Sequence, residues 1–206
     1  MSAPRHPPEK VRRAGAAATV RFLEKDGAHR GQGVLVPGPW ILSAAHVVHW
    51  DHTGAMAGSF NEREFLQEIT VAGGSRFRVY PQAVEPVHDL AVLGAVDGQW
   101  LPHDDDAFEA FCAATLPVPL ATGEFYSEQD HRANLRRIRR QEATEPRRTV
   151  PAYVLAHTGA WIRGRVRQIL PKAPSLVLET ETLIQGGTSG GPVVTADGGY
   201  SASSRG

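Results

Sequence analysis

The sequence predicts an all-β protein. Short runs rich in β-branched and aromatic residues recur along most of the chain, and Gly, Pro, Asp or His residues separate them. The run Arg76-Phe77-Arg78-Val79-Tyr80 alternates polar and apolar residues, as expected for a strand with one face in water. Many short strands at this spacing favour an antiparallel barrel.

The expected strands form two groups. The first group covers residues 18–24, 32–36, 40–43, 68–71, 76–84 and 90–93, and the second covers residues 151–156, 161–170 and 175–181. Residues 61–67 suit either a short helix or an elaborated loop. Between the groups, the Asp-rich and Ala-rich residues 104–114 predict a crossing segment, and residues 116–120 would then enter the second group.

Two segments look different from the strands. Residues 1–14 are rich in proline and basic residues and predict a disordered leader. Residues 124–148 interleave arginines with acidic residues, which favours a solvated helix or mobile insertion, with a docking or regulatory surface as the alternative. A nucleic-acid patch is disfavoured, because the aromatic residues available for base stacking, Phe125 and Tyr126, precede the arginines.

Composition narrows the class of protein. The 206 residues, 41% of them apolar, suit one domain or two small lobes. The 22 basic and 22 acidic residues cancel, so charge does not argue for nucleic acid or an anionic membrane as a partner. The single cysteine, Cys112, excludes an intramolecular disulfide. Since residues 14–20 are also too short for a signal-peptide core, we expect a cytoplasmic protein without a membrane span.

The segment Gly187-Thr188-Ser189-Gly190-Gly191 predicts nucleophile chemistry. Its glycines allow a sharp turn and bring backbone N–H groups close to whatever the Ser189 hydroxyl attacks. A serine needs a base and a group that orients the base. His46, after a run of small residues, suits the base, and Asp89, ahead of a predicted strand, suits the orienting carboxylate. The N–H groups of Gly187 and Ser189 would form the oxyanion hole.

Simpler interpretations exist for each residue. A serine among glycines is usually a turn residue, and an aspartate ahead of a strand is commonly a turn or cap residue. Asp51 competes with Asp89 as the orienting group, but it lies on what reads as the same short helical segment as His46. Asp89 is therefore the preferred candidate.

A metal site is the alternative use of the histidines. His46, His49 and His52 follow one another at a spacing of three residues. Zinc ligands on one helix more commonly show a spacing of four with an acidic partner, and a single cysteine offers no thiolate cluster. The sequence therefore predicts neither a metal nor a cofactor.

Together these motifs resemble the trypsin-like (chymotrypsin-fold) serine proteases of the disulfide-free bacterial type. The matching pieces are the Gly-x-Gly strand from Gly31 to Val36, Ser-Ala-Ala-His ending at His46, His-Asp-Leu-Ala-Val-Leu around Asp89, and Gly-Thr-Ser-Gly-Gly-Pro around Ser189. They occur in the family's order and span roughly residues 18–196.

The resemblance implies a fold and an activity. It implies two antiparallel β-barrels, residues 15–112 and 113–206, with His46 and Asp89 from the first and Ser189 from the second. It implies a serine endopeptidase that hydrolyses polypeptides through an acyl-enzyme intermediate. Because related bacterial modules are often joined to regulatory domains, it also implies a regulatory protein partner.

Three departures from the digestive enzymes of this family carry information. Thr188 replaces an aspartate that pairs with a new N-terminus after zymogen cleavage, so the oxyanion loop must be organised in another way. Leu183 stands where trypsin has an aspartate, so the substrate-binding candidates Leu183, Ile184 and Gln185 do not predict cleavage after basic residues and look more like the HtrA type. The chain ends soon after Ser189, which predicts a C-terminally shortened form with an incomplete second barrel.

Two other functions stay open. The shortened C-terminus and the arginine-rich insertion suit a catalytically impaired protease-like binding or regulatory module. An esterase of the α/β-hydrolase type would also carry Gly-x-Ser-x-Gly, the spacing of residues 187–191. That fold needs the order Ser, acid, His, whereas His46 precedes Ser189 and no histidine follows it.

Overall fold

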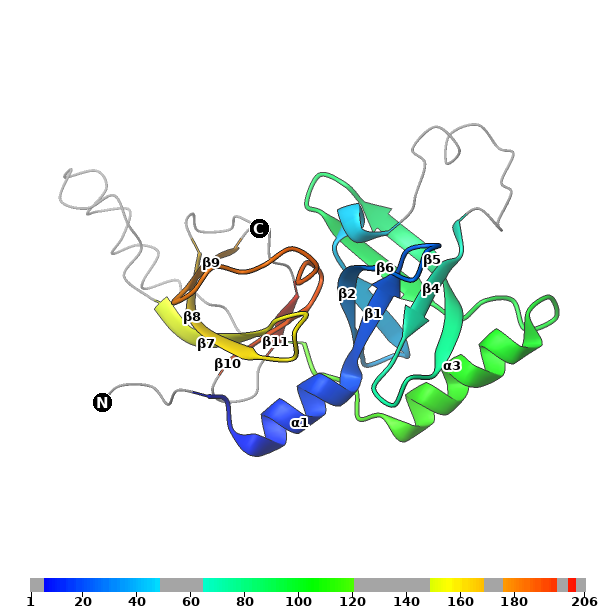
Figure 1. Cartoon of the computed structure of the whole chain (residues 1–206), viewed down its shortest axis with the longest axis horizontal. Coiled ribbons are helices and arrows are strands. Elements are labelled where there is room, and N and C mark those ends of the chain that lie inside the picture. Colours follow the sequence, from blue (N-terminus) through cyan, green and yellow to red (C-terminus); the bar gives the residue numbers. More distant parts are fainter. Residues whose placement is uncertain (1–5, 49–64, 121–148, 169–175, 196–199, 203–206) are drawn as a thin grey trace.

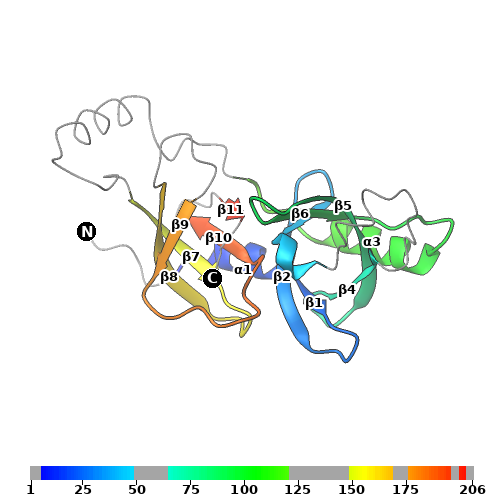
Figure 2. The same cartoon turned by 90° about the horizontal axis from the view of Figure 1, so that it is seen from above.

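The strands of the protein gather into two lobes that lie side by side (Figures 1 and 2). The computed structural model describes residues 6–48, 65–120, 149–168, 176–195 and 200–202. The first lobe contains β1 (Thr19–Leu23), β2 (His29–Val36), β3 (Trp40–Ser43), β4 (Gln67–Thr70), β5 (Arg76–Glu85) and β6 (Leu90–Gly94). The second lobe contains β7 (Thr149–Leu155), β8 (Trp161–Gln168), β9 (Leu176–Thr180), β10 (Pro192–Thr195) and β11 (Tyr200–Ala202).

The first lobe is a closed antiparallel barrel in the order β1-β2-β3-β6-β5-β4. The alternating pattern on β5 explains its orientation, because Phe77 and Val79 are buried while Arg76 and Arg78 are exposed. Closure pairs the edges of the sheet, so β1 hydrogen-bonds to both β2 and β4. The barrel thereby provides a rigid frame for the loops at its rim.

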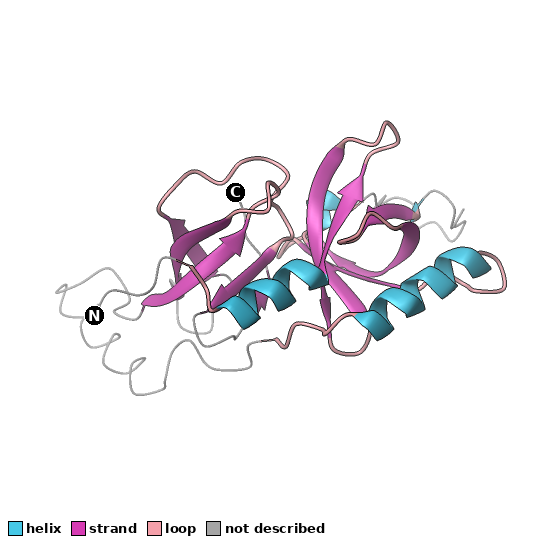
Figure 3. Ribbon diagram, turned by 60° about the horizontal axis from the view of Figure 1, so that its bottom comes forward, coloured by secondary structure: helices cyan, strands magenta, loops and turns pink. Residues whose placement is uncertain are grey.

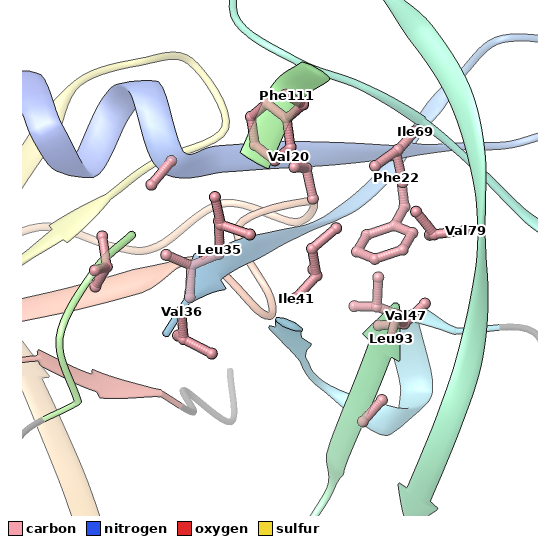
Figure 4. Close-up of a cluster of buried hydrophobic side chains, with 14 of the residues drawn as sticks. Val20, Phe22, Leu35, Val36, Ile41, Val47, Ile69, Val79, Leu93 and Phe111 are labelled. Carbon is pink, nitrogen blue, oxygen red and sulfur yellow. The ribbon is translucent and has the colours of Figure 1, made fainter. Parts of the chain in front are cut away.

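One apolar cluster fills the barrel (Figure 4). Phe22, Ile41 and Leu93 are fully buried within it. The same cluster extends to Tyr153 on β7 and Val194 on β10, which belong to the second lobe. Because the two lobes share buried apolar surface, their relative position is fixed by packing.

The second lobe is an open five-stranded sheet in the order β11-β10-β7-β8-β9. The prediction of an all-β protein with a first barrel and an incomplete second one is therefore confirmed for the described strands. The charged insertion expected at residues 124–148 lies outside the described residues. So does most of the segment 61–67, for which the sequence left helix or loop open.

A helix replaces part of the expected disordered leader, so that expectation is wrong for residues 9–14. Helix α1 (Glu9–Ala18) is rich in alanine, the best helix former, and begins with the acidic Glu9, which pairs with Arg12. It contacts β2 of the first lobe and β10 of the second, and it runs along one side of the molecule (Figure 3). Packing of Gly15 and Ala18 against the lobes stabilises a helix too short to persist alone.

A second helix, α3 (Pro102–Ala114), occupies the segment expected to cross between the lobes. Pro102 at its start and acidic residues in its first turn favour the helix over an extended crossing. It packs on β5, where Phe108 and Phe111 lie with their ring centroids 6.2 and 5.9 Å from that of Phe77. The helix continues past the boundary expected at residue 112.

An ion pair also fastens α3 to the barrel. The Asp104 carboxylate accepts hydrogen bonds from the backbone N–H of Arg78 at 2.7 Å and from its guanidinium at 2.6 and 2.9 Å. After the helix, Val118 donates its backbone N–H to the Leu35 carbonyl, so the chain passes along β2 toward the second lobe. Of the described helices, none has the length and apolar character needed to span a membrane.

The aromatic contact between β5 and α3 yields a stability prediction. Phe77→Ala should lower the free energy of unfolding by about 3–5 kcal/mol, because it leaves a cavity beneath Phe108 and Phe111. Leu116→Ala is the control, since Leu116 is 66% exposed and its truncation should change the value by less than about 0.5 kcal/mol. Urea denaturation measures both, and equal effects would contradict this account of the packing.

Candidate active site

The structure brings His46 and Asp89 together at the rim of the barrel. His46 lies on the 3₁₀-helix η1 (Ala45–Val47) after β3, and Asp89 lies in the turn between β5 and β6. One Asp89 oxygen lies 2.8 Å from His46 Nδ1, and the other accepts the His46 backbone N–H at 3.0 Å. The His46 side chain is 53% exposed and that of Asp89 only 14%, so the imidazole is accessible while its carboxylate partner is sheltered.

The turn that carries Asp89 is strained and braced. Asp89 has φ of 57°, a left-handed conformation that is uncommon outside glycine. Glu85 braces the turn, because its carboxylate accepts the backbone N–H groups of Val87 and His88 at 3.1 and 2.7 Å and lies 2.6 Å from His88 Nδ1. The His88 backbone amide is the main cause that lowers the pKa of Glu85. Such strain is commonly found at functional sites.

The Ser189 turn belongs to the second lobe but is hydrogen-bonded to the first. The Gly191 N–H donates to the Thr188 carbonyl at 3.0 Å and closes a turn around Ser189 just before β10. The Ser189 carbonyl accepts the backbone N–H of Gln32 on β2 at 2.8 Å. The Gln32 carbonyl in turn accepts the Ser43 hydroxyl at 2.7 Å, which ties this contact to β3.

Gly190 makes this contact between the lobes possible. Its φ is 79°, and a Cβ at this position would lie 2.1 Å from the Gln32 carbonyl oxygen and 2.5 Å from Ser43 Oγ. Only glycine fits both the conformation and the space. The turn therefore sits directly on the end of β3, the strand that leads to His46.

In the described part of the chain, the Ser189 hydroxyl and the His46 imidazole are separate hydrogen-bonding groups. Within the described residues, no hydrogen bond joins Ser189 Oγ to His46. In sites without substrate such hydrogen bonds are often long and tighten only when the complex forms. Asp51, the alternative orienting residue, lies outside the described part of the chain.

The oxyanion candidates are organised by the turn between β7 and β8. Gly187 has φ of 85°, and neither its N–H nor that of Ser189 donates to another described residue. Thr188 is fully buried, and its hydroxyl oxygen accepts the backbone N–H of His157 at 3.3 Å. The neutral contact between Thr188 and His157 thus stands where the digestive enzymes use a charged aspartate.

The substrate-binding candidates differ in their surroundings. Leu183 is 93% exposed and Gln185 is exposed, while Ile184 packs partly against the apolar cluster of the second lobe. A cavity of about 450 Å³ opens elsewhere, between α1, the turn after β4 and the turn after β7, and none of these three residues lines it. Leu183 is therefore the apolar side chain that this segment offers most openly to a ligand.

The alternative use of His46, His49 and His52 as metal ligands can be compared with the structure only for His46. His49 and His52 lie outside the described residues. Among the residues that are described, no group of three or more His, Cys, Asp or Glu side chains is arranged to hold a metal ion.

Sequence reasoning missed the residues that join the lobes. Gln32 is 1% exposed, and it is the one polar side chain in the otherwise apolar or glycine run of residues 31–36. A buried glutamine at that position could have indicated a structural contact. Glu85 and His157 carried no comparable signal, because their roles depend on turn geometry.

The family model described as "Trypsin-like peptidase domain" matches residues 31–200. The chain belongs to the trypsin-like peptidase family. In the structure of this chain, His46 and Asp89 lie in the first lobe and the glycine-rich turn of Ser189 lies in the second. None of the curated proteins matches the chain.

A solved structure supports the fold of this trypsin-like peptidase. The crystal structure of the serine endoprotease from Yersinia pestis is similar with a TM-score of 0.53 and 18% sequence identity. The match covers 97% of this chain and 56% of that protein. The trypsin-like peptidase therefore spans little more than half the length of that relative, and the likeness establishes the fold.

The fit of Gly190 yields a prediction with a matched control. Gly190→Ala should lower the rate at which a fluorophosphonate probe labels the protein at least about 100-fold, because the added Cβ forces the turn off β2 and β3. Gly27 has a similar positive φ of 83°, so an alanine there also costs about 1–2 kcal/mol of backbone strain. Its Cβ, however, would meet no atom within 4 Å. Gly27→Ala should label like the parent, and equal losses in the two variants would refute the contact argument.

Proposed function

We propose that this trypsin-like peptidase is a serine endopeptidase in which Ser189 is the nucleophile, His46 the general base and Asp89 the orienting carboxylate. The observation that carries the proposal is the double contact of Asp89 with His46, at 2.8 and 3.0 Å. An Nδ1–H that donates to Asp89 leaves Nε2 free to accept a proton. The imidazole is 53% exposed, so it is accessible to a substrate.

The proposed reaction follows from these positions. Ser189 Oγ attacks a peptide carbonyl carbon while its proton passes to His46 Nε2. The carbonyl oxygen becomes an oxyanion, which accepts the N–H groups of Gly187 and Ser189. The C–N bond breaks as the imidazolium protonates the leaving amine, and an ester to Ser189 remains. Water, deprotonated by His46, hydrolyses that ester and restores the hydroxyl.

The substrate is proposed to be a polypeptide that passes the segment of Leu183, Ile184 and Gln185. This segment is uncharged and Leu183 is exposed, so it suits apolar or neutral side chains better than basic ones. We propose a cytoplasmic location, because the chain has a single cysteine and gains no disulfide from an oxidising compartment. A regulatory protein partner and a bacterial origin are carried over from the family resemblance.

A catalytically impaired binding module is the second candidate. It is favoured by the lack of a hydrogen bond between Ser189 and His46 within the described residues and by the open second sheet. Such a module would bind polypeptides without cleaving them. Labelling of the serine separates the two candidates.

The first test is modification of the nucleophile. A fluorophosphonate probe should label the protein, and Ser189→Ala should abolish labelling because it removes the proposed nucleophilic hydroxyl. Ser75→Ala, at an exposed turn, should label like the parent. Mass spectrometry locates the adduct, and folded protein that stays unlabelled would favour the binding module.

The second test addresses the orienting carboxylate. Asp89 accepts two N–H groups of His46, whereas an asparagine can accept one and must point its NH₂ at the other. Asp89→Asn should lower kcat by about 10⁴-fold, the typical loss when the orienting aspartate of a Ser-His-Asp triad becomes asparagine and the imidazole takes the wrong tautomer. Hydrolysis of a p-nitrophenyl ester measures the change. A loss below about tenfold would remove Asp89 from the proposed triad.

A further inference from the structure

Two histidines outside the proposed triad lie against the oxyanion segment. His29 begins β2 and His157 lies in the turn after β7, so they come from different lobes. Their ring centroids are 5.8 Å apart with an angle of 32° between the planes. His29 Nε2 and His157 Nδ1 are both buried and have no hydrogen-bond partner within the described residues. The proposed reaction does not use either ring.

The pair contacts the residues that carry the proposed oxyanion donors. A Cβ built on Gly187 would lie 3.1 Å from His29 Nδ1 and 3.7 Å from His157 Cβ, so Gly187 rests between the two histidines. The backbone N–H of His157 also donates to the hydroxyl of the buried Thr188. The position of the Gly187 N–H is thereby coupled to both histidines.

The surroundings of the pair disfavour positive charge. Arg21 on β1 acts on His29 as a like charge, and so does His157 itself; Arg30 on β2 is partly buried close by and pairs with Glu24 and Gln67. No described carboxylate forms an ion pair with either imidazole. Burial is the main cause that lowers the pKa of His29, and a backbone interaction with Gly31 opposes it only in part. The native state therefore favours the neutral form of the His29 ring.

We propose that the His29–His157 pair is a positioning element that holds Gly187 and Thr188 in the oxyanion conformation, and that protonation of His29 within the pair disorganises the oxyanion hole. This inference rests on the proposed function. It names the residues that organise the oxyanion loop, in which Thr188 stands in place of an aspartate. An imidazolium here would meet a second imidazole and Arg21 with no counterion, so the rings must move apart and release Gly187.

The direction with pH follows from the lowered pKa of His29. Below the ordinary histidine pKa of about 6.5, the native state binds fewer protons than the unfolded chain. The ordered loop is therefore favoured above about pH 6.5, and it loses stability as the pH falls from there toward the native pKa of His29. Loss of one oxyanion donor typically lowers kcat about 10²–10³-fold.

The experiment measures the rate constant of fluorophosphonate labelling against pH. With His46 as the one essential base, the rate falls about tenfold per pH unit on the acidic side, and a second required deprotonation makes the fall approach about 100-fold per unit. We expect the steeper fall in the parent protein, over the range where circular dichroism shows that it stays folded. A fall of tenfold per unit throughout that range would overturn the inference.

A double variant tests whether the His29–His157 pair causes the steeper fall of the labelling rate at acidic pH. His29→Gln/His157→Gln cannot be protonated, so it should label more slowly at neutral pH, within about 100-fold, and fall only tenfold per unit. His103→Gln removes an exposed histidine on α3 and should keep the parent profile. A double variant that keeps the steep limb would also overturn the inference. Protein that never labels at any pH refutes the proposed function instead, and if the double variant does not fold, the parent profile alone decides.

Discussion

The proposed site depends on one hydrogen bond between the lobes, from the Gln32 N–H to the Ser189 carbonyl. It attaches a turn of the second lobe to a strand of the closed barrel, whose rim also holds His46 and Asp89. A residue without a side chain at position 190 is the condition for that attachment, because the Gln32 carbonyl and Ser43 Oγ occupy the space of a Cβ. The proposed nucleophile is thus positioned by backbone atoms.

The other parts of the molecule support that junction. The apolar cluster of the barrel continues through Tyr153 and Val194 into the second lobe, so the sheets do not meet across solvent. On the opposite side of the barrel, α3 covers β5 through Phe108, Phe111 and the ion pair of Asp104. Rigid packing of this kind keeps side chains from separate loops within the small distances that proton transfer requires.

Much of the fold could be predicted from local patterns. The alternation around Arg76–Tyr80 located β5, because that part of the strand has one buried and one wet face. The short apolar runs located the other barrel strands within a few residues, including β2, which is buried at every residue from Gly31 to Val36. The helices were missed, since proline and charge at residues 1–14 and aspartates near residue 104 read as irregular structure. Their stability comes from tertiary packing, which a local pattern does not contain.

The candidate site also has residues that motifs identify and residues that only the tertiary structure reveals. His46, Asp89 and Ser189 stand in motifs that the resemblance made readable, and the structure pairs the first two. Gln32, His29 and His157 make carbonyl, amide and ring contacts between segments distant in sequence, and Glu85 accepts N–H groups within its own turn. Such contacts depend on which turns meet in space. The resemblance implied that the oxyanion loop is organised in another way than through an aspartate. In the structure the Thr188 hydroxyl accepts a backbone N–H, a contact that no residue type reveals.

Helix α1 has a mechanical consequence. It touches β2, the strand that receives the Ser189 turn, and β10, the strand that follows that turn. Any sliding of one lobe over the other must shear this helix. A displacement of α1 would therefore act on both of the strands that hold the Ser189 turn.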